Sequence, residues 1–275
     1  MAHNQAPGAG RGDWRAADWS AFTGRAPAAG VLSDFDGTLS PIVEDRDSAL
    51  PLPGTNAALA ALARRCRLVA VISGRPVAFL ESVLPSVPGL LLVGLYGIER
   101  SQDGRRSVLP DARPWQAPVR RAVADACGAM PPGVEVEDKG LTLAVHCRKA
   151  PEAFGQVAAW AEEEAAATGL AVQPGKLAVE LLPPVPMDKG RVVSELAAGL
   201  DAVLFIGDDV GDLPGFAAVR RMRRGGRKAV AVGVGSDEQP AELAKAVDYV
   251  LDGPEEALDL LRFLSDGAPP ATAGH

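Results

Sequence analysis

The sequence has few of the residues from which covalent cross-links and soft-metal sites are built. The 275 residues include three cysteines, Cys66, Cys127 and Cys147. Scattered thiols in odd number favour reduced cysteines over a disulfide framework or a zinc site. Of the three histidines, His3 and His275 lie near the chain ends, which leaves only His146 inside. The sequence therefore offers too few histidines to favour a histidine-rich metal centre or histidine phosphotransfer.

Also missing is any apolar run of the ~20 residues that cross a bilayer, so we expect no membrane partner. The first part of the chain has no apolar core segment, so we expect no secretory signal and a cytoplasmic protein. The net charge of -7 argues against nucleic acid as a partner, because phosphate contacts need a basic surface. We expect a monomer that acts on a small molecule.

Short apolar runs alternate with longer amphipathic stretches in residues 13–109 and again in 184–265. The predicted buried strands are Gly30–Ser33, Leu68–Ile72, Gly89–Val93, Val203–Ile206 and Ala229–Val232. The predicted helices include Gly54–Arg65, Pro76–Leu84, Lys189–Ala198 and Pro240–Ala246. This alternation predicts an α/β core with a doubly wound, mostly parallel, Rossmann-like sheet, and a site at the carboxyl ends of its strands. The tails, 1–12 and 266–275, are predicted to be disordered.

Residues 110–183 have a different pattern, in which a helix and two strands occur twice. The predicted elements are Pro114–Met130, Val134–Asp138, Leu141–Arg148, Pro151–Thr168, Ala171–Gln173 and Leu177–Leu182. We interpret this block as an inserted α+β cap domain. Strand alternation puts its apolar side chains on one face, toward the helices, and leaves Glu, Lys, His and Arg side chains on an open face. Such a face suits a ligand with many hydroxyls, because charged side chains hydrogen-bond to sugars.

Two acidic clusters follow two of the predicted buried strands. Asp34 and Asp36 come directly after the first strand, and Gly37 lets the backbone turn close to a ligand. Asp208, Asp209 and Asp212 follow the strand Val203–Ile206. Two carboxylate clusters at one sheet edge repel each other unless a hard cation lies between them. Mg²⁺ fits best, because it accepts a few carboxylates and leaves room for phosphate oxygens.

Two further segments offer phosphate-binding groups. Ser73-Gly74-Arg75 joins the strand that ends at Ile72 to a helix, and a hydroxyl with backbone amides at a helix start can hold a phosphate. We count Arg75 among the substrate-binding candidates. Lys189 begins the helix that leads into the Asp208 strand, where its charge could neutralise phosphate and steady Asp34.

In order and spacing these residues resemble the four motifs of the haloacid dehalogenase superfamily, with a cap inserted between the second and third motifs. The resemblance implies that Asp34 attacks phosphorus and that Asp36 protonates the leaving oxygen and then activates water. It implies that Ser73 and Lys189 hold the phosphate. The implied Mg²⁺ ligands are Asp34, the carbonyl of Asp36 and Asp208, supported by Asp209 and Asp212.

A closer resemblance is to the trehalose-6-phosphate phosphatase family, which hydrolyses trehalose 6-phosphate to trehalose and phosphate. The segments that carry it include Asp34–Ile42, Gly94–Glu99, Glu137-Asp138-Lys139, His146-Cys147-Arg148, Gly175-Lys176, Glu180 before Pro183-Pro184, and Asp188-Lys189-Gly190. By this resemblance the sugar-gripping residues of the cap are Glu137, Lys139, Arg148, Lys176 and Glu180. His146, on the same predicted face, joins them as a substrate-binding candidate.

The sequence departs from the family pattern at a few positions. Gly211, Asp212 and Leu213 stand where Thr-Asp-Glu is usual, Tyr96 replaces a common histidine, and Leu182 replaces an arginine. These changes bear on the sugar more than on the phosphate. Sucrose 6-phosphate and a glycosyl-phosphoglycerate stay open as alternative substrates on the same core and cap.

Readings from other classes fit less well. A dinucleotide fingerprint at Gly233-Val234-Gly235 fails because its third glycine would fall at Glu238. A glycosidase would need its carboxylates on separate strands that flank a sugar cleft, whereas Asp34 and Asp36 lie on one turn. An inactive domain that only binds a sugar phosphate is disfavoured by the intact motifs.

Overall fold

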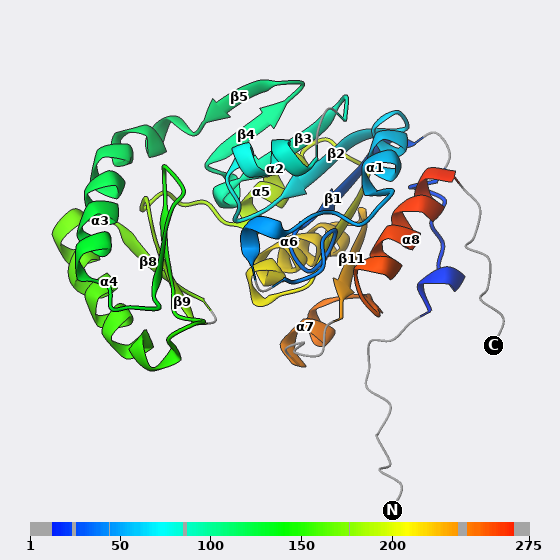
Figure 1. The fold of residues 1–275 in the computed structure, drawn as a ribbon. Helices are drawn as coiled ribbons and strands as arrows, with labels where there is room; N and C mark the ends of the chain where they lie inside the picture. Colours follow the sequence, from blue (N-terminus) through cyan, green and yellow to red (C-terminus); the bar gives the residue numbers. More distant parts are fainter. Residues whose placement is uncertain are drawn as a thin grey trace, which may run out of the picture. The chain divides into compact units, whose positions relative to one another are not determined.

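The computed structural model describes residues 13–23, 26–43, 45–84, 87–175, 177–235 and 241–266. These residues divide into two compact units. The core unit holds the described residues up to Arg106 and from Asp188 onward, and the insert unit is Ser107–Met187. Figure 1 shows the elements of both. No helix in the described ranges combines the length and apolar character that a bilayer crossing requires.

The core unit is built on one twisted sheet, in which the described residues form eight strands in the order β12-β11-β10-β1-β2-β3-β4-β5. The strands are β1 (Ala26–Ser33), β2 (Cys66–Ile72), β3 (Leu90–Gly94), β4 (Glu99–Gln102), β5 (Arg105–Val108), β10 (Ala202–Gly207), β11 (Lys228–Val234) and β12 (Tyr249–Leu251). The pairs from β12 through to β3 are parallel, and β4 joins β3 antiparallel. The predicted mostly parallel α/β core is confirmed.

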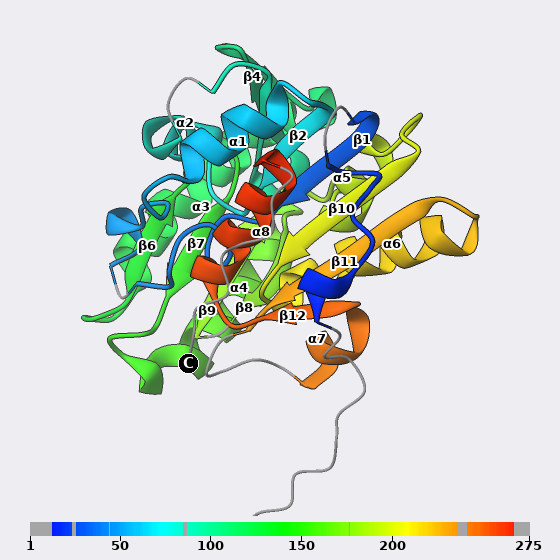
Figure 2. The ribbon, with the colours of Figure 1, turned by 90° about the vertical axis from the view of Figure 1, so that its right-hand side faces the viewer.

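Helices cover both faces of this sheet, as Figure 2 shows for α1 and α8 in front and α5 and α6 behind. The helices of the unit are α1 (Thr55–Ala63), α2 (Val77–Val83), α5 (Lys189–Leu196), α6 (Leu213–Arg224), α7 (Ala241–Ala246) and α8 (Pro254–Asp266). Successive residues of a strand point to opposite faces of the sheet, so alternate residues pack against the helices on each face. Leu204 and Ile206 join the core under α1 and α8, whereas Phe205 packs against Phe216 of α6 with ring centroids 5.3 Å apart.

An N-terminal segment packs into the core under α1 and α8, a contact that no sequence pattern predicted. Trp14 begins a short 3-10 helix, Trp14–Ala16, and is 2% exposed. Its Nε1 donates to Glu256 Oε1 of α8 at 2.9 Å, and its ring meets Phe263 edge-on. Trp19 packs against Tyr249 of β12 in the same core.

The insert unit has its own antiparallel sheet, in the order β6-β7-β9-β8, and its own core. Its elements are β6 (Glu135–Asp138), β7 (Leu143–His146), β8 (Ala171–Gly175), β9 (Ala178–Leu182), α3 (Gln116–Ala129) and α4 (Phe154–Thr168). Val145, Val179 and Leu181 pack with residues of α3 and α4, such as Val119 and Val157. The helices therefore cover one face of this sheet.

Several predicted boundaries were wrong. β7 ends at His146, because the Cys147 amide turns to bond the Leu177 carbonyl at 2.7 Å, so Arg148 lies in an exposed turn rather than in the strand. A 3-10 helix, Pro110–Trp115, contains Pro114, and α3 begins after it. The predicted tails lie outside the described residues except for Asp266, which ends α8.

Candidate active site

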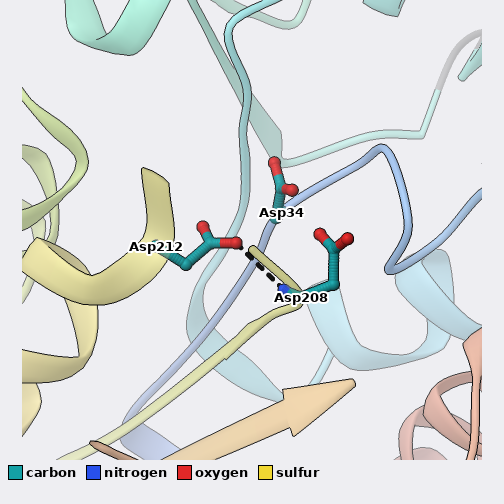
Figure 3. Close-up of side chains that lie close together, drawn as sticks. All are labelled: Asp34, Asp208 and Asp212. Carbon is teal, nitrogen blue, oxygen red and sulfur yellow. Dashed lines mark hydrogen bonds between the residues drawn. The ribbon is translucent and has the colours of Figure 1, made fainter. Parts of the chain in front are cut away.

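The site lies where β1 and β10 end side by side. The two strands pair in parallel up to Ser33 and Ile206, and the Asp34 amide continues the pairing by donating to the Ile206 carbonyl at 2.8 Å. Asp34 and Asp208 therefore leave the same edge of the sheet. The 3-10 helix Val210–Asp212 then returns Asp212 to that edge. Figure 3 shows the three side chains gathered there, with the Asp212 carboxylate directed toward the other two.

One buried lysine joins two of these carboxylates. Lys189 Nζ lies 2.8 Å from Asp34 Oδ1 and 2.7 Å from Asp212 Oδ1. Asp188 caps the N-terminus of α5 by accepting from the Arg191 amide, which fixes the start of the helix that carries Lys189. Lys189 and Asp34 are 4% and 5% exposed, so little water screens their attraction.

Asp212 also holds the loop that carries the second acidic cluster. Its Oδ2 accepts from the backbone amides of Asp208 at 3.0 Å and Asp209 at 3.2 Å, and the first of these bonds is drawn in Figure 3. Asp212 therefore bonds Lys189 with one oxygen and the loop backbone with the other. The Asp209 side chain is exposed and caps the 3-10 helix in return.

Gly37 allows the two acidic loops to come this close. It has a φ of +72°, a conformation that glycine adopts without strain. A Cβ at this position would lie 2.0 Å from Asp208 Oδ2, so no larger residue fits. The neighbouring Thr38 hydroxyl lies 3.5 Å from Asp208 Oδ1 and is fully buried.

Burial and mutual repulsion shape the charges of the site. Burial raises the pKa of Asp208 to about 7, with the charges of Asp212 and Asp209 adding to the effect. Burial also raises the pKa of Asp34 well above its usual range, although Lys189 opposes the shift. For Lys189, burial disfavours the charge, but the Asp212 and Asp34 carboxylates outweigh it and raise its pKa. The three buried carboxylates are thus in excess over the Lys189 ammonium that contacts them.

This excess of hard oxygen donors fits a metal ion. Asp34, Asp208 and Asp212 each offer a carboxylate oxygen, and the three atoms lie within 4.8 Å of one another. Carboxylates are the ligands that hard divalent cations prefer. Because both Asp212 oxygens already hold Lys189 and the loop amides, Asp34 and Asp208 have the more available oxygens.

Asp36 lies outside this triad and is held by Arg75 instead. The Arg75 guanidinium donates from Nε to Asp36 Oδ2 at 2.9 Å and from Nη2 to Oδ1 at 2.8 Å. The same guanidinium stacks on the Phe79 ring, 4.5 Å from its centroid. The Asp36 side chain remains 38% exposed, whereas Asp34 is buried.

Ser73 lies in the loop between β2 and α2. It is 1% exposed, and its hydroxyl oxygen accepts from the Arg75 amide at 3.1 Å, which leaves the hydroxyl proton for another acceptor. Glu99 of β4 accepts from the Val77 amide at 2.8 Å and so caps α2. No sequence pattern indicated this role for Glu99.

In the insert unit, four of the six predicted sugar-binding residues form two polar contacts. Glu180 Oε1 accepts from Lys139 Nζ at 3.0 Å and from the buried Thr142 hydroxyl at 2.7 Å. Glu137 Oε2 lies 2.9 Å from His146 Nε2. Arg148 lies apart in its exposed turn. The sixth residue, Lys176, is outside the described residues.

Comparison with known proteins places the chain in a family. The trehalose-phosphatase family model matches residues 32–253. A trehalose-phosphate phosphatase of Mycobacterium avium (strain 104) is 36% identical over 257 residues, which cover 89% of this chain and 63% of that relative. The chain therefore spans less than two thirds of that relative's length.

Solved structures share the fold. The crystal structure of a trehalose-6-phosphate phosphatase related protein has a TM-score of 0.73 at 20% identity and covers 86% of this chain and 96% of its own. The C-terminal domain of trehalose-6-phosphate phosphatase from C. albicans has a TM-score of 0.69 at 24% identity, with 86% and 91% covered. The match over residues 32–253 confirms the relationship predicted from the motifs, and the chain belongs to the trehalose-phosphatase family.

Proposed function

We propose that the protein is a Mg²⁺-dependent phosphatase that hydrolyses trehalose 6-phosphate to trehalose and phosphate through an aspartyl-phosphate on Asp34. The observation that carries the proposal is the buried Asp34 carboxylate, held by Lys189 beside Asp208 and Asp212 at the carboxyl edge of a parallel sheet. The family match and the name of the M. avium relative support the substrate.

In the first step, an Asp34 oxygen attacks phosphorus and the bond from phosphorus to the sugar oxygen breaks. The leaving oxygen takes a proton from Asp36, which Arg75 keeps in place. Lys189 holds the nucleophile and, with the Ser73 hydroxyl, offsets charge on the transferred group. Covalent capture divides one difficult displacement into two easier ones.

In the second step, water attacks the aspartyl-phosphate. Asp36 takes a proton from that water, the bond between phosphorus and the Asp34 oxygen breaks, and phosphate leaves with the carboxylate restored. Asp34, Asp208 and the Asp36 carbonyl would hold Mg²⁺, which when bound neutralises phosphate charge. Asp209 and Asp212 support the loop around it.

The insert unit supplies the sugar contacts in this proposal. Glu180, on the sheet face opposite α3 and α4, bonds Lys139 and the buried Thr142, which both lie in the turn between β6 and β7. Glu137 and His146 add a second pair on the same sheet. Charged groups whose orientation is already fixed lose little entropy when they bind sugar hydroxyls.

The test is phosphate release from a panel of sugar phosphates with Mg²⁺ present, using wild-type protein and Asp34→Asn. We expect trehalose 6-phosphate to have the highest kcat/KM, and Asp34→Asn to fold normally and release no phosphate. Similar turnover of sucrose 6-phosphate and trehalose 6-phosphate would refute the assigned sugar. Activity of Asp34→Asn would refute the nucleophile.

A further inference from the structure

Two consecutive residues at the end of β3 have a backbone conformation that side-chain-bearing residues rarely adopt. Leu95 has a φ of +48° and Tyr96 a φ of +57°. Non-glycine residues with positive φ are strained and persist only where the surrounding structure imposes them, often beside active sites. Glycines stand on either side of the pair, at 94 and 97. The strained conformation is nevertheless adopted by the two residues between them, which carry side chains.

Both strained residues donate their amides to the loop that contains Ser73. The Leu95 amide bonds the Arg75 carbonyl at 3.0 Å, and the Tyr96 amide bonds the Ser73 carbonyl at 3.1 Å. The Ser73 amide in turn donates to the Val93 carbonyl at 2.9 Å. The left-handed turn therefore aims two successive amides at the carbonyls on either side of Gly74.

The two segments are also locked together sterically. A Cβ on Gly74 would lie 2.6 Å from the Tyr96 hydroxyl oxygen and 2.7 Å from its ring carbon Cζ. A Cβ on Gly94 would lie 2.7 Å from the Arg75 carbonyl oxygen. The Tyr96 side chain thus lies directly over the loop, with no space between them for a methyl group.

We propose that Leu95 and Tyr96 form a strained brace that positions the Ser73–Arg75 loop and, through the Arg75 guanidinium, the carboxylate of Asp36. The proposal rests on the proposed function, which assigns phosphate binding to Ser73 and proton transfer to Asp36. Leu95 is fully buried, so its packing in the core is enough to explain a leucine at this position. Tyr96 is only partly buried, and its strain serves the position of the loop.

The test compares Tyr96→Gly, which removes the strain and the ring, with Tyr96→Phe, which keeps both. Asp103→Asn is the matched control, because Asp103 also has a positive φ, +50°, but lies in the turn between β4 and β5. Asparagine tolerates that conformation and keeps a side-chain oxygen for the Gly89 amide. The measurements are Tm, kcat, and the Kd for inorganic phosphate by calorimetry with Mg²⁺.

For Tyr96→Gly we expect Tm to stay equal or rise, kcat to fall about 10- to 100-fold, and phosphate to bind more weakly, because a small displacement of the loop misplaces Ser73 and Asp36. Tyr96→Phe should retain most activity, and Asp103→Asn should match the wild type in all three measurements. Wild-type kcat and phosphate affinity in Tyr96→Gly would overturn the brace. A lower Tm with unchanged kcat would also overturn it, because the residue would then serve stability alone.

A double substitution tests the steric contact itself. Gly74→Ala should lower kcat in the wild-type background, because its methyl group meets Tyr96, and should lower it less in the Tyr96→Gly background. Equal losses in both backgrounds would overturn the contact. If Tyr96→Gly fails to fold, Tyr96→Asn, which tolerates the left-handed conformation, replaces it.

The failure of the brace can be told apart from the failure of the proposed function. A wild-type protein that releases no phosphate from trehalose 6-phosphate would contradict the function. The series of Kd values for inorganic phosphate would still decide whether Tyr96 positions the loop.

Discussion

Arg75 holds Asp36 with two parallel hydrogen bonds, Nε to Oδ2 at 2.9 Å and Nη2 to Oδ1 at 2.8 Å. The two residues come from the loops after β2 and β1, so the contact links the Ser73 loop to the turn that begins at Asp34. A bidentate guanidinium fixes the plane of a carboxylate as well as its position. Each Asp36 oxygen keeps a lone pair for a proton or a water.

Replacing Arg75 should therefore slow catalysis. For Arg75→Lys we expect kcat to fall about 10- to 100-fold, because a single ammonium cannot reproduce the bidentate contact and Asp36 loses its orientation. Steady-state kinetics on trehalose 6-phosphate measure the change. Arg100→Lys is the matched control, since Arg100 makes a bidentate pair with Glu195 at an exposed position and should leave kcat unchanged. Equal effects of the two substitutions would contradict the assignment.

Asp212 should matter for stability as well as for activity. Asparagine has only one side-chain oxygen, so Asp212→Asn must abandon either Lys189 or the amides of Asp208 and Asp209. We expect a loss of about 2–3 kcal/mol in the free energy of unfolding, the size of a lost charged hydrogen bond with buried donors left unpaired. Urea titration measures it. Asp209→Asn, at an exposed carboxylate, should change stability by less than about 0.5 kcal/mol.

Without a metal, the acidic site should make stability depend on pH. Folding raises the Asp208 pKa from its ordinary value of 3.8 to about 7, so the folded state binds more protons than the unfolded state between these values. The contribution of this protonated carboxyl group to the free energy of unfolding is therefore fully present below about pH 4. It is lost as pH rises through about 7. Urea titrations with a chelator present, at several pH values, measure the slope.

Added Mg²⁺ should oppose this loss, because the cation replaces the proton on the carboxylates. The rise in Tm caused by Mg²⁺ should therefore be larger at about pH 8 than at about pH 5.5. Asp208→Asn should show a smaller pH slope and a smaller response to Mg²⁺. A response to Mg²⁺ that does not change with pH would argue against a site at these carboxylates.

Glu180 offers a test of the sugar contacts separate from the phosphate chemistry. For Glu180→Gln we expect kcat/KM for trehalose 6-phosphate to fall about 10- to 100-fold, the cost of one or two charged hydrogen bonds. Turnover of a small aryl phosphate should hardly change, because such a molecule has no sugar hydroxyls. Glu163→Gln, at an exposed position on α4, is the control. A parallel loss on both substrates would mean that Glu180 serves the fold rather than the sugar.

Trp14 should anchor the N-terminal segment to the core unit. Trp14→Ala removes a ring that is 2% exposed, together with its bond to Glu256 and its contact with Phe263. We expect a loss of about 3–5 kcal/mol, typical of large-to-small changes in a core. Trp14→Phe should lose less, because it keeps an aromatic ring against Phe263. Urea titration decides, and a loss below about 1 kcal/mol would show that the segment adds little.

The central strands could be predicted because they are buried on both faces and appear as continuous apolar runs, such as Val203–Ile206. The last two strands of the sheet, β4 and β5, could not, because their sequences, ERSQ and RRSV, have neither apolar runs nor a clear alternation. Trp14 was missed for a related reason, since two tryptophans in a short segment have no period that indicates what they pack against.

At the site, motif order predicted that two acidic clusters would meet, and Asp34, Asp208 and Asp212 do meet, whereas Asp36 lies outside the group. Motif order did not predict the contacts that each carboxylate makes. Asp212 was expected to support the metal, and in the structure it holds Lys189 and the Asp208 amide. Asp36 and Arg75 were assigned separate roles, and they bond to each other. Such pairings depend on side-chain direction across distant loops, which spacing along the chain does not determine.

The close approach at Gly37 is limited by atomic size, whereas other contacts of the site depend on attraction between charges. The Asp208 carboxylate occupies the space where a Cβ would stand, so the distance between the two acidic loops is limited by atomic size. Dissolved ions screen attraction between charges but leave atomic radii unchanged. High ionic strength should therefore loosen the partly exposed pair of Arg75 and Asp36 while the spacing between Gly37 and Asp208 stays the same. The spacing of the two loops that carry the carboxylates should thus not depend on the salt concentration around the protein.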